Sequence, residues 1–149
     1  MKETMAIYEQ LEKIVNNIRI LPGGAEFEAF GNGFTVFFRD KYSGMCAYWI
    51  GGGLGLCYNY NLFLWSSLSD GAKRALIMHE TSEIMLYEYL VTRAGSSMER
   101  GQILPAAHQA ASRMDKMYIR RNCDAEDKHD IVQAFKECAE RLGMKSKSL

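Results

Sequence analysis

The pattern of hydrophobic and polar positions divides the chain into a helical start, a middle built of strands and a helical second half. Apolar side chains recur at helical spacing from about residue 4 to residue 20, which predicts an amphipathic helix. Four stretches rich in aromatic and β-branched residues predict the strands of an antiparallel meander, at 25–30, 34–39, 45–50 and 54–60. Three further helices are predicted over 71–93, 105–121 and 124–142. This order of elements favours an α+β fold, in which a small antiparallel sheet packs against helices.

Turn and capping residues support several of these boundaries. The three glycines at 51–53 are expected to turn the chain between the third and fourth strands. Ser67, Ser69 and Asp70 offer side chains that can cap the start of the second helix. Pro105 suits the first position of the third helix, because the N–H that proline lacks would have no partner there.

The composition is that of an ordinary globular protein, and it narrows the choice of partners. The chain has 149 residues, 48% of them hydrophobic, which suits one domain covering 1–149. Its 18 basic and 18 acidic side chains cancel, so no overall field attracts nucleic acid or anionic lipid, and we expect neither partner. The four cysteines form no C-x-x-C pair and match neither a disulfide framework nor a zinc knuckle. Because the sequence lacks an apolar run of about 18 residues, it predicts no signal peptide or membrane span and therefore a cytoplasmic protein.

The residues that carry chemistry concentrate in the second predicted helix. Residues 79–83 read His-Glu-Thr-Ser-Glu, an H-E-x-x-E motif. Positions 79 and 83 lie one helical turn apart, so the imidazole of His79 and the carboxylate of Glu83 can converge on one ion. Glu80 lies about 100° further round the helix and can flank such a site without binding the ion. The spacing therefore predicts a metal site with a carboxylate beside it.

The apolar surroundings of the motif make an unpartnered carboxylate costly. His79 and Glu83 share a helical face with Leu76 and Leu86, which predicts that this face packs against the core. A buried carboxylate costs several kcal/mol unless it is paired, and coordination to a cation removes that cost. A hydrogen-bonded pair of His79 and Glu83 meets the same requirement without a metal. Both interpretations, a metal site and a buried His–carboxylate pair, are open at this point.

A third ligand is available on the next predicted helix. His108 is surrounded by alanines, which allow a neighbouring helix to approach closely. His79, Glu83 and His108 match the His₂Glu set of catalytic zinc sites, which keep a fourth position for water, and Fe²⁺ suits the same set. Asp115, two turns beyond His108, is expected to orient that imidazole or to bind the metal itself. Glu80 is then the candidate general base for the attack of water on a carbonyl.

The motif and its setting resemble the zincin-like metallopeptidases. The resemblance rests on the strand-like segment 54–59, the short serine-rich connection after it and the helix that contains the motif. Within the zincin-like proteins it points to the ImmA/IrrE-like group and to small H-E-x-x-E metallopeptidases. It implies a zincin-like fold, zinc held by His79 and by a later residue such as His108, and Glu80 as the catalytic base. Glu83 stands where the H-E-x-x-H pattern of the family has its second histidine.

The function that the sequence favours is zinc-dependent hydrolysis of a peptide or protein substrate, with Glu80 as general base. An extended substrate is expected to add main-chain hydrogen bonds to the edge of the strand at 54–60. The alternative is a catalytically inactive zincin-like scaffold that binds a protein partner and keeps a structural metal or a buried His–Glu pair. A third interpretation, a regulatory nucleic-acid binder, would use Arg120 and Arg121 and would bind with a strong salt dependence.

Overall fold

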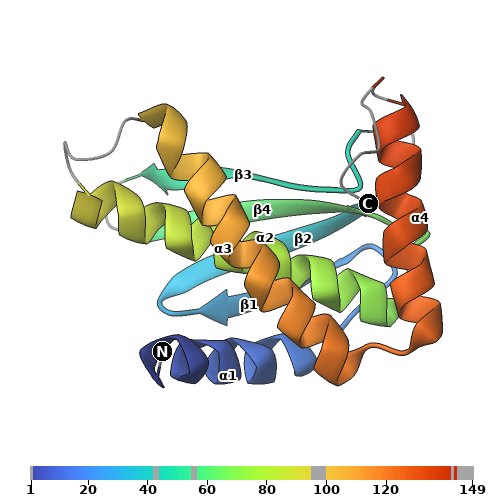
Figure 1. Cartoon of the computed structure of the whole chain (residues 1–149), viewed down its shortest axis with the longest axis horizontal. Helices are drawn as coiled ribbons and strands as arrows, with labels where there is room; N and C mark the ends of the chain where they lie inside the picture. Colours follow the sequence, from blue (N-terminus) through green and yellow to red (C-terminus); the bar gives the residue numbers. More distant parts are fainter. Residues whose placement is uncertain (1, 42–43, 55–56, 95–99, 142, 144–149) are drawn as a thin grey trace.

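The computed structural model describes residues 2–41, 44–54, 57–94, 100–141 and 143, which form four helices and four strands. In chain order these are α1 (Lys2–Asn16), β1 (Gly24–Ala29), β2 (Asn32–Arg39), β3 (Ala47–Leu54), β4 (Cys57–Trp65), α2 (Asp70–Ala94), α3 (Arg100–Asn122) and α4 (Ala125–Arg141). Figure 1 shows α2 running across one face of the sheet and α3 crossing over α2. The predicted α+β class is confirmed.

The sheet is mixed, and in this respect the predicted antiparallel meander is wrong. The strand order is β1-β2-β4-β3, so β1 and β3 are the edge strands. Both edge strands pair antiparallel with their neighbours, whereas β2 and β4 are parallel. Strand β3 does not pair with β2, although it follows β2 in the chain. Strand β4 lies between β2 and β3, antiparallel to β3 and therefore parallel to β2. Hydrophobic periodicity is the same in both arrangements, so the pattern predicts the strands but not their order.

The glycines at 51–53, predicted as a turn, lie inside β3 and pair with residues 58–60 of β4. At Gly51, a Cβ atom would lie 2.8 Å from the carbonyl oxygen of Asn59 and 2.9 Å from the Cα atom of Tyr60. Such separations are too short for a side chain, so glycine is required here by the close approach of two strands. The strand therefore continues through the glycines to Leu54.

The helix boundaries agree with the sequence at the start of α2 and differ at two other places. Ser69 caps α2, because its Oγ accepts a hydrogen bond from the backbone N–H of Ala72 at 3.2 Å. Helix α3 begins at Arg100, so Pro105 lies inside it and not at its first position. Because proline has no N–H, it makes no hydrogen bond to the carbonyl oxygen of Gly101 four residues earlier. Helix α1 ends at Asn16, before the predicted end at residue 20. Within the described residues, no helix combines the length and the apolar character that a membrane crossing needs.

Helix α2 occupies the centre of the molecule. It packs between the sheet and α3, and it also contacts α1 and α4. Residues 75–84 are all buried, although they include His79, Glu80 and Glu83. The hydrophobic core of which α2 is part draws its largest side chains from the other elements as well, among them Tyr8, Leu11, Leu62, Leu64 and Tyr118. The three ionisable groups of the motif therefore lie where protein groups, and not bulk water, have to supply most of their partners.

Candidate metal centre

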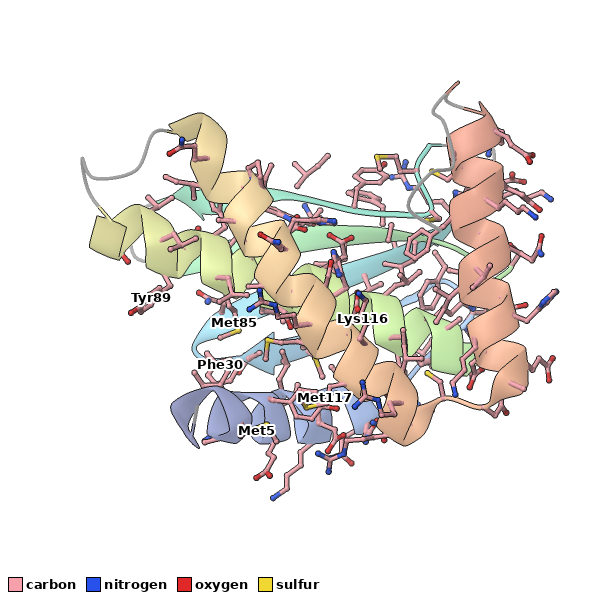
Figure 2. The ribbon with its side chains drawn as sticks, viewed as in Figure 1. Met5, Phe30, Met85, Tyr89, Lys116 and Met117 are labelled. Carbon is pink, nitrogen blue, oxygen red and sulfur yellow. The ribbon has the colours of Figure 1, made fainter. Side chains whose placement is uncertain are left out.

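The crossing of α2 and α3 brings the predicted site residues together. Figure 2 shows α3 passing in front of α2, with the labelled Lys116 on α3 where the two helices overlap in this view. On the same helix, His108 lies between Ala107 and Ala111, which are both fully buried. The small alanine side chains leave room for the two helices to pack closely, as the sequence predicted.

Three ligand atoms from the two helices converge at this crossing. His79 Nε2 lies 3.3 Å from Glu83 Oε2 and 3.2 Å from His108 Nδ1, and His108 Nδ1 lies 2.6 Å from Glu83 Oε2. Two ligands bound to a tetrahedral zinc at about 2.0 to 2.1 Å stand about 3.3 Å apart, so two of these separations already suit a shared ion. The third is a direct hydrogen bond, and it would lengthen by less than about 1 Å around a metal. His79, Glu83 and His108 therefore form a cluster within metal-binding distance.

The cluster is buried on the α2 side and open on the α3 side. The side chains of His79 and Glu83 are 9% and 11% exposed, whereas that of His108 is 62% exposed. An ion bound between them would be enclosed by protein groups on the α2 side and accessible to solvent beside His108. This is the arrangement of a site that admits an exogenous ligand, because fully enclosed metal sites have no free position.

Asp115 supports His79 and not His108. Its Oδ2 lies 2.6 Å from His79 Nδ1, so the carboxylate can accept a hydrogen bond from the Nδ1–H and leave Nε2 facing the cluster. A carboxylate in this position fixes the tautomer and the orientation of a metal-binding imidazole. The sequence predicted that Asp115 would orient His108, and this partner was wrong. Because α3 crosses α2, the side chain of Asp115 contacts His79 on α2 and not His108 on its own helix.

The charges of the cluster are tuned by burial and by mutual hydrogen bonds. Burial lowers the pKa of His79, but hydrogen bonds to the carboxylates of Asp115 and Glu83 outweigh this effect and raise that pKa to about 10. Burial raises the pKa of Glu83, but hydrogen bonds from His79, Trp49 and His108 outweigh it and lower that pKa to about 2. In the metal-free chain at neutral pH, His79 is therefore a cation held between two carboxylates.

Glu80 lies in a different environment from Glu83, although both belong to the motif. It is 6% exposed, and no hydrogen bond to its carboxylate is found among the described residues. Burial raises the pKa of Glu80 to about 7, with the negative charges of Glu83 and Asp115 adding to the effect and the positive charge of His79 opposing it. A carboxyl group with this pKa can both take and give a proton near neutral pH, as a general base requires. Glu80 is therefore a buried carboxyl group and not an exposed surface glutamate.

Trp49 is a site residue that sequence reasoning missed. Its indole Nε1–H, from strand β3, donates a hydrogen bond of 2.9 Å to Glu83 Oε1. The indole N–H of a tryptophan generally finds a hydrogen-bond partner when the ring is taken out of water, and this was the one signal in the sequence. The ring of Trp49 is partly buried. The identity of the partner depends on β3 lying beside α2, which the predicted strand order did not provide.

No family model, curated protein or solved structure matches this chain. The resemblance to zincin-like metallopeptidases therefore stays a prediction from sequence.

We expect metal binding to depend strongly on pH. Because the pKa of His79 is about 10, a metal has to displace its proton at neutral pH. The apparent association constant for Zn²⁺ should therefore rise about tenfold per pH unit between about pH 6 and pH 9 on account of this proton. Competition with a chromophoric chelator at several pH values measures the slope. A flat profile would show that His79 gives up no proton to the metal.

Proposed function

We propose that this protein is a metal-dependent hydrolase that cleaves peptide bonds, with Zn²⁺ held by His79, Glu83 and His108. The observation that carries the proposal is the convergence of three ligand atoms from two helices, all within 4.8 Å of one another. Two imidazoles and one carboxylate are the donor set of one class of catalytic zinc sites, and the same set also suits Fe²⁺ among other divalent metals.

The residues around the cluster have complementary roles in this proposal. Zinc bound there would polarise a carbonyl and lower the pKa of a water molecule to about 7. Asp115 holds His79 with Nε2 directed at the cluster, through the 2.6 Å contact to Nδ1. Glu80 takes the proton of the water that attacks the peptide carbonyl, and it then gives that proton to the amine that leaves. The pKa of Glu80, about 7, suits both transfers.

Strand β3 is the better candidate for docking an extended substrate. The sequence predicted the edge of residues 54–60, but β4 is paired on both sides and offers no free edge. Strand β3 is an edge strand, and its Trp49 contacts Glu83 of the cluster. A peptide that adds to β3 as a further strand would make main-chain hydrogen bonds next to the proposed metal.

The basic residues named for a nucleic-acid role are partly committed to the protein itself. Arg121 Nε lies 3.3 Å from Glu12 Oε2, and its guanidinium lies over the ring of Tyr8 at 5.5 Å. These contacts favour a structural role for Arg121 and weaken the interpretation of the protein as a nucleic-acid binder.

Metal loading combined with a peptide assay tests the proposal. We expect chelator-treated protein to take up one equivalent of Zn²⁺ and then to cleave members of a quenched fluorescent peptide library, with activity lost on renewed chelation. Uptake of zinc without any cleavage would favour the alternative, a zincin-like scaffold that binds a protein partner. Absence of metal uptake would leave a buried His–carboxylate pair and overturn the proposal.

A further inference from the structure

The link between strand β3 and the metal cluster is the hydrogen bond from Trp49 to Glu83. Trp49 pairs with Leu62 of β4, and its side chain lies on the face of the sheet that carries α2. The indole Nε1–H donates to Glu83 Oε1 at 2.9 Å. An edge strand of the sheet thus contacts a proposed metal ligand directly.

This hydrogen bond divides the two oxygens of Glu83 between different tasks. Oε1 accepts from Trp49, while Oε2 lies 3.3 Å from His79 Nε2 and 2.6 Å from His108 Nδ1. A carboxylate that is held at one oxygen presents the other as a single ligand atom. Without the indole N–H, the carboxylate could rotate or bind an ion through both oxygens, and Oε1 would lose its partner in a residue that is only 8% exposed.

The indole is itself held in place by aromatic neighbours. Its ring lies edge-on to Tyr60, with centroids 6.0 Å apart and planes at 78°, and it is tilted against Tyr87 of α2 at 5.8 Å. These contacts restrict the ring and therefore the direction of the N–H. Trp49 has the properties of a rigid donor, which a flexible surface side chain would lack.

We propose that Trp49 is a positioning residue that fixes Glu83 as a single-oxygen metal ligand and makes strand β3 sensitive to metal occupancy. The inference rests on the metal site proposed above. When a cation binds Glu83 Oε2, it withdraws negative charge from the carboxylate. The hydrogen bond that Oε1 accepts from Trp49 then weakens, and the environment of the indole on β3 changes. Reciprocally, a change at β3 that moves the indole alters metal affinity, because coupling between two sites acts in both directions.

Zinc affinity in the full-length protein tests the positioning role. Trp49→Phe keeps an aromatic ring between Tyr60 and Tyr87 and removes the pyrrole part of the indole, which carries the N–H donor. We expect this variant to bind Zn²⁺ about 10- to 100-fold more weakly, as is typical when the residue that supports a metal ligand is lost. Tyr48→Phe is the matched control, because Tyr48 neighbours Trp49 on β3 but stacks on Phe63 instead of contacting the cluster. Its affinity should stay within about twofold.

A spectroscopic measurement separates positioning from a general loss of structure. With Co²⁺ in place of Zn²⁺, the visible absorption bands of the Trp49→Phe variant should differ from those of the wild type, whereas Tyr48→Phe should reproduce the wild-type bands. Wild-type zinc binding together with an unchanged dissociation constant and unchanged Co²⁺ bands in Trp49→Phe would overturn the inference. A wild type that binds no zinc would instead overturn the proposed metal site.

A second measurement uses the native sequence and does not depend on the folding of a variant. The chain contains two tryptophans, so protein labelled with 5-fluorotryptophan gives two ¹⁹F resonances. Zinc should shift the resonance of Trp49 and saturate at one equivalent, while Trp65, whose indole donates to the carbonyl oxygen of Gly44, should be unaffected. Binding of zinc without a shift of the Trp49 resonance would count against the inference as strongly as an unchanged affinity.

Discussion

His79→Ala is expected to eliminate stoichiometric metal binding. The imidazole of His79 is one of the three proposed ligands, and its Nε2 lies near both other members of the cluster, 3.3 Å from Glu83 Oε2 and 3.2 Å from His108 Nδ1. Loss of a residue that merely supports a ligand costs roughly 10- to 100-fold in metal affinity, so loss of a ligand should cost more than 100-fold. Elemental analysis of purified protein after supply of Zn²⁺ measures the result directly.

The control for this experiment is the histidine outside the cluster. His129 is exposed on α4, so His129→Ala should retain the full metal content of the wild type. His79→Ala also removes the partner of two carboxylates, and leaving a buried ion pair half complete costs about 3 to 5 kcal/mol. Circular dichroism should therefore accompany the analysis, and His79→Gln, which retains a polar side chain, serves where the alanine variant unfolds. A folded His79 variant with wild-type metal content would refute the assignment of this ligand.

Glu80→Gln is expected to lower the rate of peptide hydrolysis by about 10²- to 10⁴-fold, the usual contribution of a general base. The substitution keeps the size of the side chain and removes its ability to take a proton. Metal content should stay at the wild-type level, because Glu80 is outside the ligand cluster. The pKa of Glu80 is about 7 in the metal-free chain, and the positive charge of bound zinc would lower it. The carboxylate form is then lost as pH falls below neutral, so kcat/KM should decline on the acid side of pH 7.

The matched control for Glu80 is another glutamate on the same helix. Glu88 accepts a hydrogen bond from the hydroxyl of Tyr60 at 2.7 Å and lies two turns further along α2. Glu88→Gln should retain most of the hydrolytic rate. Equal activity of Glu80→Gln and the wild type would exclude Glu80 as the base, and an equal loss in both variants would indicate a structural effect of altering α2.

The features that sequence predicted correctly are those that depend on neighbours along the chain. The cap of α2 by Ser69 and the one-turn spacing of His79 and Glu83 follow from helix geometry within a few residues. The placement of His108 opposite them was accessible because the alanines beside it indicate close helix packing. These local and near-local signals were sufficient to find the cluster.

The features that sequence could not predict depend on segments far apart in the chain. The parallel pairing of β2 with β4 leaves the hydrophobic pattern of both strands unchanged, so no periodicity distinguishes it from a meander. The partner of Asp115 is set by the crossing of α3 over α2, and the partner of Trp49 by the position of β3 at the sheet edge. A run of glycines can mark a turn or a close approach of strands, and only the pairing of β3 with β4 decides between them at Gly51.

Because the proposed ligands come from two separate helices, metal binding would tie folding to the supply of metal. An ion shared by His79 and Glu83 on one helix and His108 on the other would act as a removable cross-link between α2 and α3. By mass action, free metal at 100 times its dissociation constant would stabilise the native state by about 2.7 kcal/mol. In a cell short of the metal, the protein would lose this stabilisation and its proposed hydrolytic activity at the same time. The metal-free protein would then be degraded in preference to the metal-bound form.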